Sequence, residues 1–136
     1  MSSEVWWTPS HPFKSSLTGQ SPADLATAFE AATGKQWTQP IGFAHALFEV
    51  AMHALARVKE LDDARAVRDA VAATDVDTIV GKVKWGGQGP FRNVSKTPLV
   101  GGQWKKGTGK HRYDLVVVSN AQAPAVPVGG KLEPIR

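Results

Sequence analysis

The chain changes its hydrophobic period once, between Asp75 and Trp85, and this change limits the folds that it can adopt. Before this stretch, apolar residues recur mainly at the spacing of helices. From Lys82 to Trp85 they alternate with lysines, which is the two-residue period of a strand with one solvent-facing side. We therefore expect helices in the first part of the chain and strands and turns in the second, with Val83 and Trp85 facing the core.

The first expected helix has a complete start signal. Ser21 can cap it, Pro22 suits its first turn, and Asp24 stands three residues after the cap. Gly34 suits its end, because glycine readily adopts the left-handed conformation that often terminates a helix. The apolar stripe that we expect to be buried consists of Leu25, Ala28, Phe29 and Ala32.

The longest expected helix runs from Ile41 to about Lys59. Its apolar residues cover well over half of the circumference, so burial on more than one side is expected. They are Leu47, Phe48, Val50, Ala51, Ala54, Leu55 and Val58. The remaining stripe carries His45, Glu49, His53 and Arg57 at steps of four. Its two histidines lie about 12 Å apart along the axis, too far for one metal ion. A solvated or cleft-facing stripe with ion pairs between turns is expected instead.

A third helix is expected to begin at Asp62 and Asp63, which favour the positive end of its dipole, and to end near Thr74. Its expected buried stripe consists of Ala64, Val67, Ala70 and Val71. Asp75 and Asp77 form a close carboxylate pair after this helix. We interpret them as part of a helix-to-strand connection, because turn-forming residues surround them.

Two glycine-rich turns lie in the second part of the chain. Gly86–Pro90 is the first, and residues 106–111 join Gln103–Trp104 to Tyr113–Val118 in an expected antiparallel hairpin. Neither turn has the spacing of a phosphate-binding loop or a helix start directly after it. Ala121–Val128 is expected to be an extended tail.

The expected fold class is α/β, with three helices and a small mixed or antiparallel sheet. At 136 residues the chain is interpreted as a single partial domain. Its parts are a strand and crossing loop in 1–20, three helices in 21–74, strands and a hairpin in 75–118, and an extended tail in 119–136. The first strand is expected at Glu4–Thr8 and ends before Pro9.

Charge is distributed unevenly along the chain. Residues 1–81 carry six Lys and Arg against ten Asp and Glu, whereas residues 82–136 carry ten against two. A basic half can bind nucleic acid. Only Trp85, Trp104 and Tyr113 could stack on bases, however, and no nucleic-acid motif surrounds them. We interpret the lysines as solvent-facing sides and tips of strands and expect no nucleic-acid partner.

Residues suited to catalysis do not form a recognisable set. The chain has no cysteine, its serines lack a Gly-x-Ser-x-Gly setting, and most carboxylates stand at helix starts. We expect no enzyme, no cofactor and no metal site. An aromatic group at Trp6, Trp7, His11 and Phe13 either packs the first strand against a helix or lines an apolar ligand pocket.

The order of these features resembles the carboxy-terminal part of type I periplasmic solute-binding proteins of branched-chain amino acid ABC transporters. Ala44 and His45 stand where that family usually has an aromatic residue and an aspartate. The resemblance covers nearly the whole chain, and the order and spacing of the motifs carry it. The matching segments are Val5–Pro9, Ala44–Leu47, Val67–Val71, Thr78–Trp85, Gly86–Gly89 and Gln103–Trp104.

The resemblance implies two α/β lobes that close on a solute and present it to a membrane permease. The chain would be a fragment or truncated relative of such a protein, whose solute is small, polar or aromatic, and amino-acid-like. The solute-binding residues that the resemblance implies are Trp6 and Trp7 as apolar walls, Gln39 as a hydrogen-bonding group, and Phe43 and His45 near the hinge. A full-length parent would be periplasmic, although no signal peptide is visible at the amino terminus.

The alternative is a stand-alone oligomeric interaction protein without a transport role. The chain resembles only the last third of the longer family members, so the apolar faces of its helices need another surface. We expect a homo-oligomer formed by exchanged strands or helices. The partner of the strand at Lys82–Trp85 is expected to come from Leu99–Val118 or from another copy.

Overall fold

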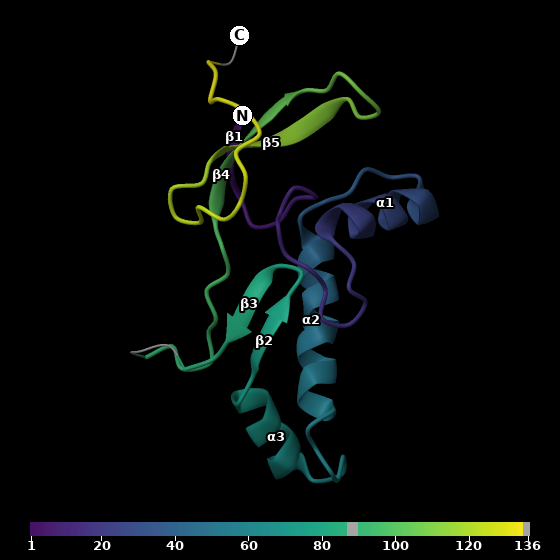
Figure 1. Cartoon of the computed structure of the whole chain (residues 1–136), viewed down its shortest axis with the longest axis vertical. Helices are drawn as coiled ribbons and strands as arrows, with labels where there is room; N and C mark the ends of the chain where they lie inside the picture. Colours follow the sequence, from purple (N-terminus) through teal and green to yellow (C-terminus); the bar gives the residue numbers. More distant parts are fainter. Residues whose placement is uncertain (87–89, 135–136) are drawn as a thin grey trace.

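The computed structural model describes residues 1–86 and 90–134, and in this part the chain is α/β, with three helices and two small antiparallel sheets (Figure 1). Gly87–Gly89, in the middle of the first expected turn, lie outside the described residues. The elements are β1 (Ser2–Val5), α1 (Pro22–Thr33), α2 (Pro40–Leu55), α3 (Ala64–Ala72), β2 (Asp75–Thr78), β3 (Gly81–Lys84), β4 (Val100–Lys106) and β5 (Tyr113–Ser119).

The larger sheet has the order β1-β4-β5, and all its pairs are antiparallel. The hairpin expected from the glycine turn at 106–111 is confirmed, with Lys106 opposite Tyr113 at its turn end. β1 is shorter than expected and lies earlier, because the chain leaves the sheet after Val5. The tail was expected to be extended, but it turns back on the sheet. Ala123 and Val126 are buried against it, and the Gly129 amide donates to Val117.

The second sheet is the β2–β3 hairpin, which corrects two expectations. Asp75 and Asp77 belong to a strand rather than to a connection, and the partner of β3 is this neighbouring strand, not a later segment or another copy. The physical reason is that the two-residue period already begins at β2, where the aspartates alternate with buried Val76 and Thr78. Across the hairpin, Lys82 Nζ lies 3.1 Å from a carboxylate oxygen of each aspartate.

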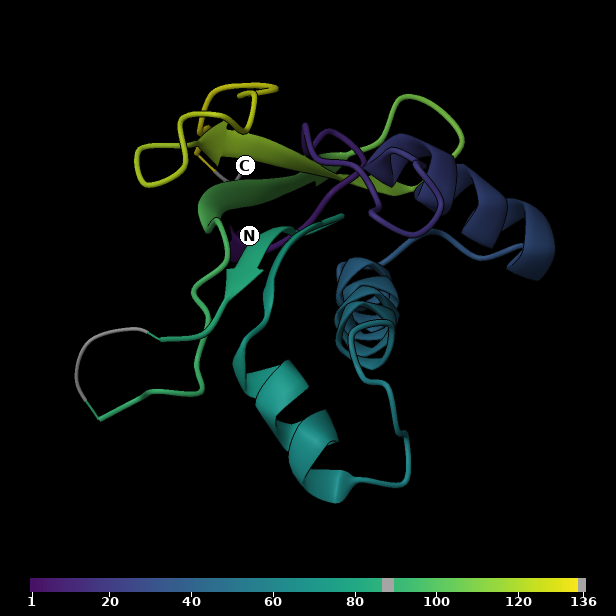
Figure 2. The same ribbon diagram turned by 60° about the horizontal axis from the view of Figure 1, so that its bottom comes forward.

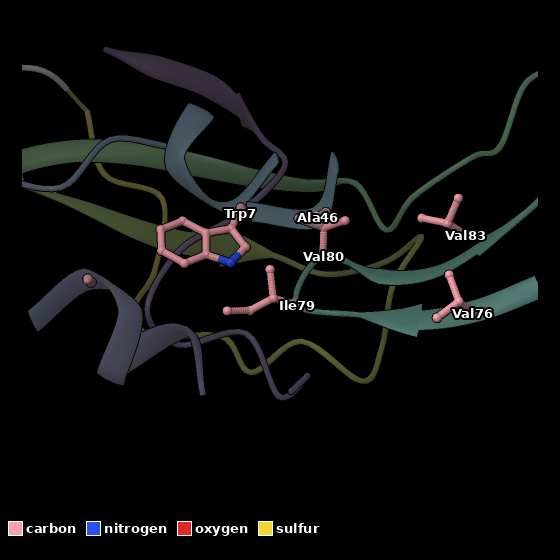
Figure 3. Close-up of a cluster of buried hydrophobic side chains, with 7 residues drawn as sticks. Trp7, Ala46, Val76, Ile79, Val80 and Val83 are labelled. Atoms are coloured by element: carbon pink, nitrogen blue, oxygen red, sulfur yellow. The ribbon is translucent and has the colours of Figure 1, made fainter. Parts of the chain in front are cut away.

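The tip of this hairpin is inserted into the core. Ile79 and Val80 are both buried, and Figure 3 shows them beside Trp7 and Ala46. Gly81 closes the turn with φ +102°, a conformation that other residues rarely adopt. As expected, Val83 is buried and Trp85 packs against the same core. The hairpin therefore contributes its turn, not only one face, to the hydrophobic core.

α1 begins and ends as the sequence predicts. The Asp24 amide donates to Ser21 Oγ, and the Ser21 amide donates to the Asp24 carboxylate, which completes a capping box. Gly34 ends the helix in the left-handed conformation. The buried stripe is displaced from the one expected, because Ala28 and Ala32 are exposed whereas Pro22 and Ala26 are buried.

α2 buries only part of the apolar face expected from its sequence, because Ala54 is buried and Val50 packs against the core, whereas other members of that face are exposed. In the stripe expected to be solvated or cleft-facing, Glu49 is fully buried, His45 and His53 are half-buried and only Arg57 is exposed. By contrast, Leu47 and Phe48 are 68% and 66% exposed. In Figure 2, where α2 is seen nearly end-on, β2, β3 and α3 lie on one side of it. Within the described residues, no helix is long and apolar enough to cross a membrane.

The inward orientation follows from the partners of Glu49. Its Oε1 accepts from the amide and hydroxyl of Ser16 at 2.6 and 3.0 Å, and its Oε2 accepts from the Ile79 amide at 3.0 Å. Three donors compensate the desolvation of one carboxylate. Arg57, expected to pair with the same stripe, instead donates to the carbonyls of Ala70 and Ala73 at the end of α3.

α3 begins at its expected cap, Asp63, whose carboxylate accepts from the amides of Arg65 and Ala66. Its expected buried stripe is covered only in part. Val67 and Ala70 are half-buried, whereas Ala64 and Val71 are exposed.

Two hydrophobic clusters form the core, and the chain passes between them. The first joins α1, α2 and β2–β3 around Trp7, and the second joins the β1-β4-β5 sheet to the tail around Val5. Trp37 packs against both clusters. The chain crosses from one cluster to the other between Val5 and Trp7, and again between β3 and β4 (Figure 1).

We expect Glu49→Gln to lower the free energy of unfolding by about 2–3 kcal/mol. The amide keeps one acceptor oxygen but places an NH₂ group against either the Ser16 or the Ile79 amide, which leaves a buried donor without an acceptor. Urea denaturation measures the change. Glu60→Gln, at an exposed position after α2, is the matched control and should stay within about 0.5 kcal/mol of the unchanged protein. Equal effects of the two substitutions would contradict this role of Glu49.

Candidate functional site

Three of the five candidate solute-binding residues lie together. Trp6, Gln39 and Phe43 meet where the chain leaves β1 and where α2 begins. The rings of Trp6 and Phe43 form an edge-to-face pair with centroids 6.3 Å apart, and Trp6 is 42% exposed. An exposed aromatic pair of this kind offers an apolar surface to a ligand.

Gln39 holds this junction together. Its Oε1 accepts from the Trp6 amide at 2.7 Å, and its Nε2 donates to the Glu4 carbonyl at 3.3 Å. Each end of the side-chain amide therefore makes one bond to the backbone around the end of β1. Since an amide oxygen has two lone pairs and an NH₂ group has two hydrogens, each end keeps one further position for a hydrogen bond.

A hollow of about 280 Å³ opens beside this junction. Besides Trp6 and Gln39, its walls come from the loop before α2 and from both strands of the β4–β5 hairpin. The sequence implicates only Gln39 of the loop 37–40 in solute binding, and neither Trp37 nor Trp104, because nothing local shows that these segments meet. The lining residues are Trp6, Trp37, Thr38, Gln39, Pro40, Trp104 and Leu115.

Trp7 does not line this hollow. It is fully buried, its ring meets that of Trp37 edge-to-face with centroids 6.0 Å apart, and it packs directly on the backbone of α2. A Cβ added to Gly42 would lie 2.5 Å from its Cγ, so only glycine allows this approach. The sequence left two interpretations of the aromatic group open, namely packing against a helix or lining a ligand pocket. Trp7 packs against a helix.

His45 also lies away from the hollow. Its Nε2 is hydrogen-bonded at 2.7 Å to Ser15 Oγ, on the inward side of α2, where Glu49 binds the neighbouring Ser16. The hydroxyl of Ser15 also accepts from the amides of Leu17 and Thr18. His45 thus helps to hold the loop between β1 and α1, and it does not line the hollow.

An ion-pair cluster fixes two walls of the hollow. Glu30 of α1 lies 2.9 Å from Lys110 Nζ and 2.8 Å from His111 Nε2, both in the turn between β4 and β5. Glu30 also accepts from the Trp37 amide at 3.2 Å, and Gln36 donates to the Tyr113 carbonyl. The hydrogen bond from Lys110 holds the pKa of Glu30 below its usual value. This cluster ties the loop that carries Trp37 to the hairpin that carries Trp104.

The lining of the hollow is similar in composition to that of small-molecule binding sites. Its walls are mainly aromatic and aliphatic, its polar groups are the Thr38 hydroxyl and the Gln39 amide, and none of its lining side chains ionises near neutral pH. Among residues 1–86 and 90–134, no group of three histidine, aspartate or glutamate side chains is placed to hold a metal ion. In small-molecule binding sites, walls of this kind contact the apolar part of a ligand and a few polar groups orient it.

Comparisons of the chain with models of protein families, with curated proteins and with solved structures found no match.

His11 belongs to the aromatic group of the first segment, with Trp6, Trp7 and Phe13. It is buried, and its Nδ1 accepts a hydrogen bond from the Thr8 amide at 3.0 Å. Burial lowers its pKa from 6.5 to about 4, and the hydrogen bond with the Thr8 backbone offsets this only in part. As the pH falls, the imidazole of His11 takes up a proton at a higher pH in the unfolded chain than in the folded protein. The contribution of His11 to stability is therefore fully present above about pH 6.5 and is lost as the pH decreases towards 4.

When the pH is lowered from about 7 to about 4.5, we expect the free energy of unfolding of the unchanged protein to fall by about 2 kcal/mol more than that of the His11→Asn variant. Asparagine keeps an acceptor for the Thr8 amide and removes the titrating group. Urea denaturation of both proteins at the two pH values measures the difference. The same pH dependence in both proteins would show that His11 remains able to ionise in the folded state.

Proposed function

We propose that the chain is the carboxy-terminal part, or a truncated relative, of a solute-binding protein of the type I periplasmic class that serves branched-chain amino acid ABC transporters. Its role is to capture a small polar or aromatic, amino-acid-like solute for uptake. The motif order from Val5–Pro9 to Gln103–Trp104 suggests the class.

The observation that carries the proposal is the position of the hollow. It lies where the chain crosses between the two hydrophobic clusters, and it takes walls from the α1–α2 loop and from β4 and β5. Ligand sites commonly form between such bodies, because a ligand bound there can bring them together. A crossing that carries the exposed Trp6–Phe43 pair is suited to that use.

The lining of the hollow favours solutes with one apolar and one polar end. Trp6, Trp37 and Trp104 offer aromatic surface to an aromatic or branched side chain, and Thr38 and Gln39 carry hydrogen-bonding groups in the same lining. A volume of about 280 Å³ lies just below the range of roughly 300–1,000 Å³ that drug-sized ligands occupy. A single amino acid is therefore a better match than a peptide or a nucleotide. In this proposal the full-length parent is periplasmic, and its protein partner is the transporter's permease.

A second candidate function is that of a stand-alone oligomeric interaction protein. One specific observation favours it, namely that α2 exposes Leu47, Phe48 and Met52. Exposed apolar surface of this kind marks contact with another protein surface.

The solute-binding proposal is tested by titrating the chain with the twenty common amino acids in a calorimeter. We expect one or more aromatic or branched-chain amino acids to bind, and Trp6→Ala to weaken that binding by at least about tenfold, because it removes an aromatic wall. Leu17→Ala, at a side chain of similar exposure outside the hollow, should leave the affinity unchanged. Absence of binding to the whole panel, or an equal loss in both variants, would refute the assignment.

A further inference from the structure

The outward face of α2 is apolar along its whole length. Phe43, Leu47, Phe48, Met52 and Leu55 are between 36% and 68% exposed, and Ala44 and Ala51 between them are exposed as well. No charged or polar side chain stands among these seven positions. The buried side of the same helix, with Gly42, Ala46 and Glu49, faces the opposite direction. A solvent-facing helix of a monomer normally carries polar residues there.

The centre of this face has the spacing of a helix-pairing seam. Ala44, Phe48, Ala51 and Leu55 follow one another at intervals of four, three and four residues. This alternation keeps one stripe facing a partner helix over these twelve residues. Leu47 and Met52 border the stripe on its two sides, so a partner helix would meet apolar surface at the edges of the seam too. A partner that offered a flat sheet surface would not require apolar residues at this spacing.

The order of small and large residues makes the seam complementary to itself. If two copies of α2 lie antiparallel with their centres at residues 49 and 50, Ala44 faces Leu55 of the partner, and Phe48 faces Ala51 of the partner. Every layer then holds one small and one large side chain, which is the arrangement that fills space between two helices. The same pairs recur on both sides of the two-fold axis, as an isologous interface requires.

The exposed area is sufficient for a dimer. With the adjoining ring of Trp6, the large side chains of this face leave roughly 600 Å² accessible, at about 150–250 Å² for a whole aromatic side chain and somewhat less for Leu and Met. The largest apolar patch of a typical monomer covers about 300–600 Å². Stable interfaces take roughly 600–1,000 Å² from each partner. The face is therefore at the upper limit for a monomer and at the lower limit for a stable dimer.

We propose that this face binds a second copy of the chain, through antiparallel pairing of α2 with α2. This proposal does not rest on the proposed solute function. Trp6 and Phe43 belong to both surfaces, whereas the other lining residues of the hollow lie outside the seam. Nor does it require exchanged strands, because every strand in the described part of the chain has a partner within it.

Light scattering behind a size-exclusion column tests the proposal. At micromolar concentration, the mass measured by light scattering should be twice the monomer mass of 14.6 kDa. Phe48→Ala leaves two small residues in a layer, and Ala51→Phe places two large ones there, so each should raise the dissociation constant by at least about tenfold. The double variant restores one small and one large residue per layer and should return the dissociation constant to within about threefold of the original.

Phe91→Ala is the matched control, because Phe91 is 69% exposed but lies far along the chain from α2. It should leave the mass unchanged, and circular dichroism should show that all variants keep the same helix content. A monomer at all concentrations would overturn the proposal and leave the face to a different protein surface. Single variants that weaken association without recovery in the double variant would overturn the antiparallel register and the proposal with it.

Cross-linking gives an independent readout of the register. The chain has no cysteine, so a disulfide can form only at introduced positions. A mixture of Ala44→Cys and Leu55→Cys proteins should form a covalent dimer that contains one of each, because these positions face each other in the antiparallel pair. Ala44→Cys alone should cross-link at least about tenfold more slowly. Faster cross-linking of Ala44→Cys with itself would contradict the antiparallel arrangement.

Discussion

The buried carboxylate of Glu49 determines how the rest of this structure is arranged. It joins three segments that are far apart in sequence, namely α2, the loop before α1 and the tip of the β2–β3 hairpin, through hydrogen bonds from Ser16 and Ile79. A buried charge is tolerated only where donors surround it. Once these donors are provided by the backbone, α2 must keep this side inward. Trp7, Ile79 and Val80 then form the first hydrophobic cluster on this side of α2 (Figure 3).

The candidate binding surfaces follow from that orientation. With its polar stripe inward, α2 presents its most apolar side to solvent, and its first turn places Phe43 beside Trp6 at the edge of the hollow. A second set of polar contacts, from Glu30 to Lys110 and His111, brings the hairpin against the other wall. These pairs join an acidic residue of the first part of the chain to basic residues of the second.

The parts of the fold that local rules determine were predictable. The capping box at Ser21 and Asp24, the glycine that ends α1 and the β4–β5 hairpin all depend on residues close in sequence. The orientation of α2 was not predictable, because the apolar residues outnumber the polar ones and the usual inference buries the majority. Only the distant amides of Ser16 and Ile79 reverse it. β2 was missed for a related reason, since aspartates disfavour strands until lysines stand opposite them.

The candidate site was predictable in part. Trp6, Gln39 and Phe43 meet, but Trp7 and His45 are used in packing and in holding a loop. Trp37 and Trp104 become walls of the hollow only through contacts between α1 and the hairpin, which no local pattern shows.

Hydrogen exchange of the Ser16 and Ile79 amides, followed by NMR, tests most directly whether Glu49 organises the fold. Both amides lie in turns or loops, where exchange is ordinarily fast, yet both donate to the same buried carboxylate. The account predicts that they exchange as slowly as the most protected amides of α2 and β4, in a single cooperative opening. Exchange of either amide at the rate of an exposed loop would contradict it.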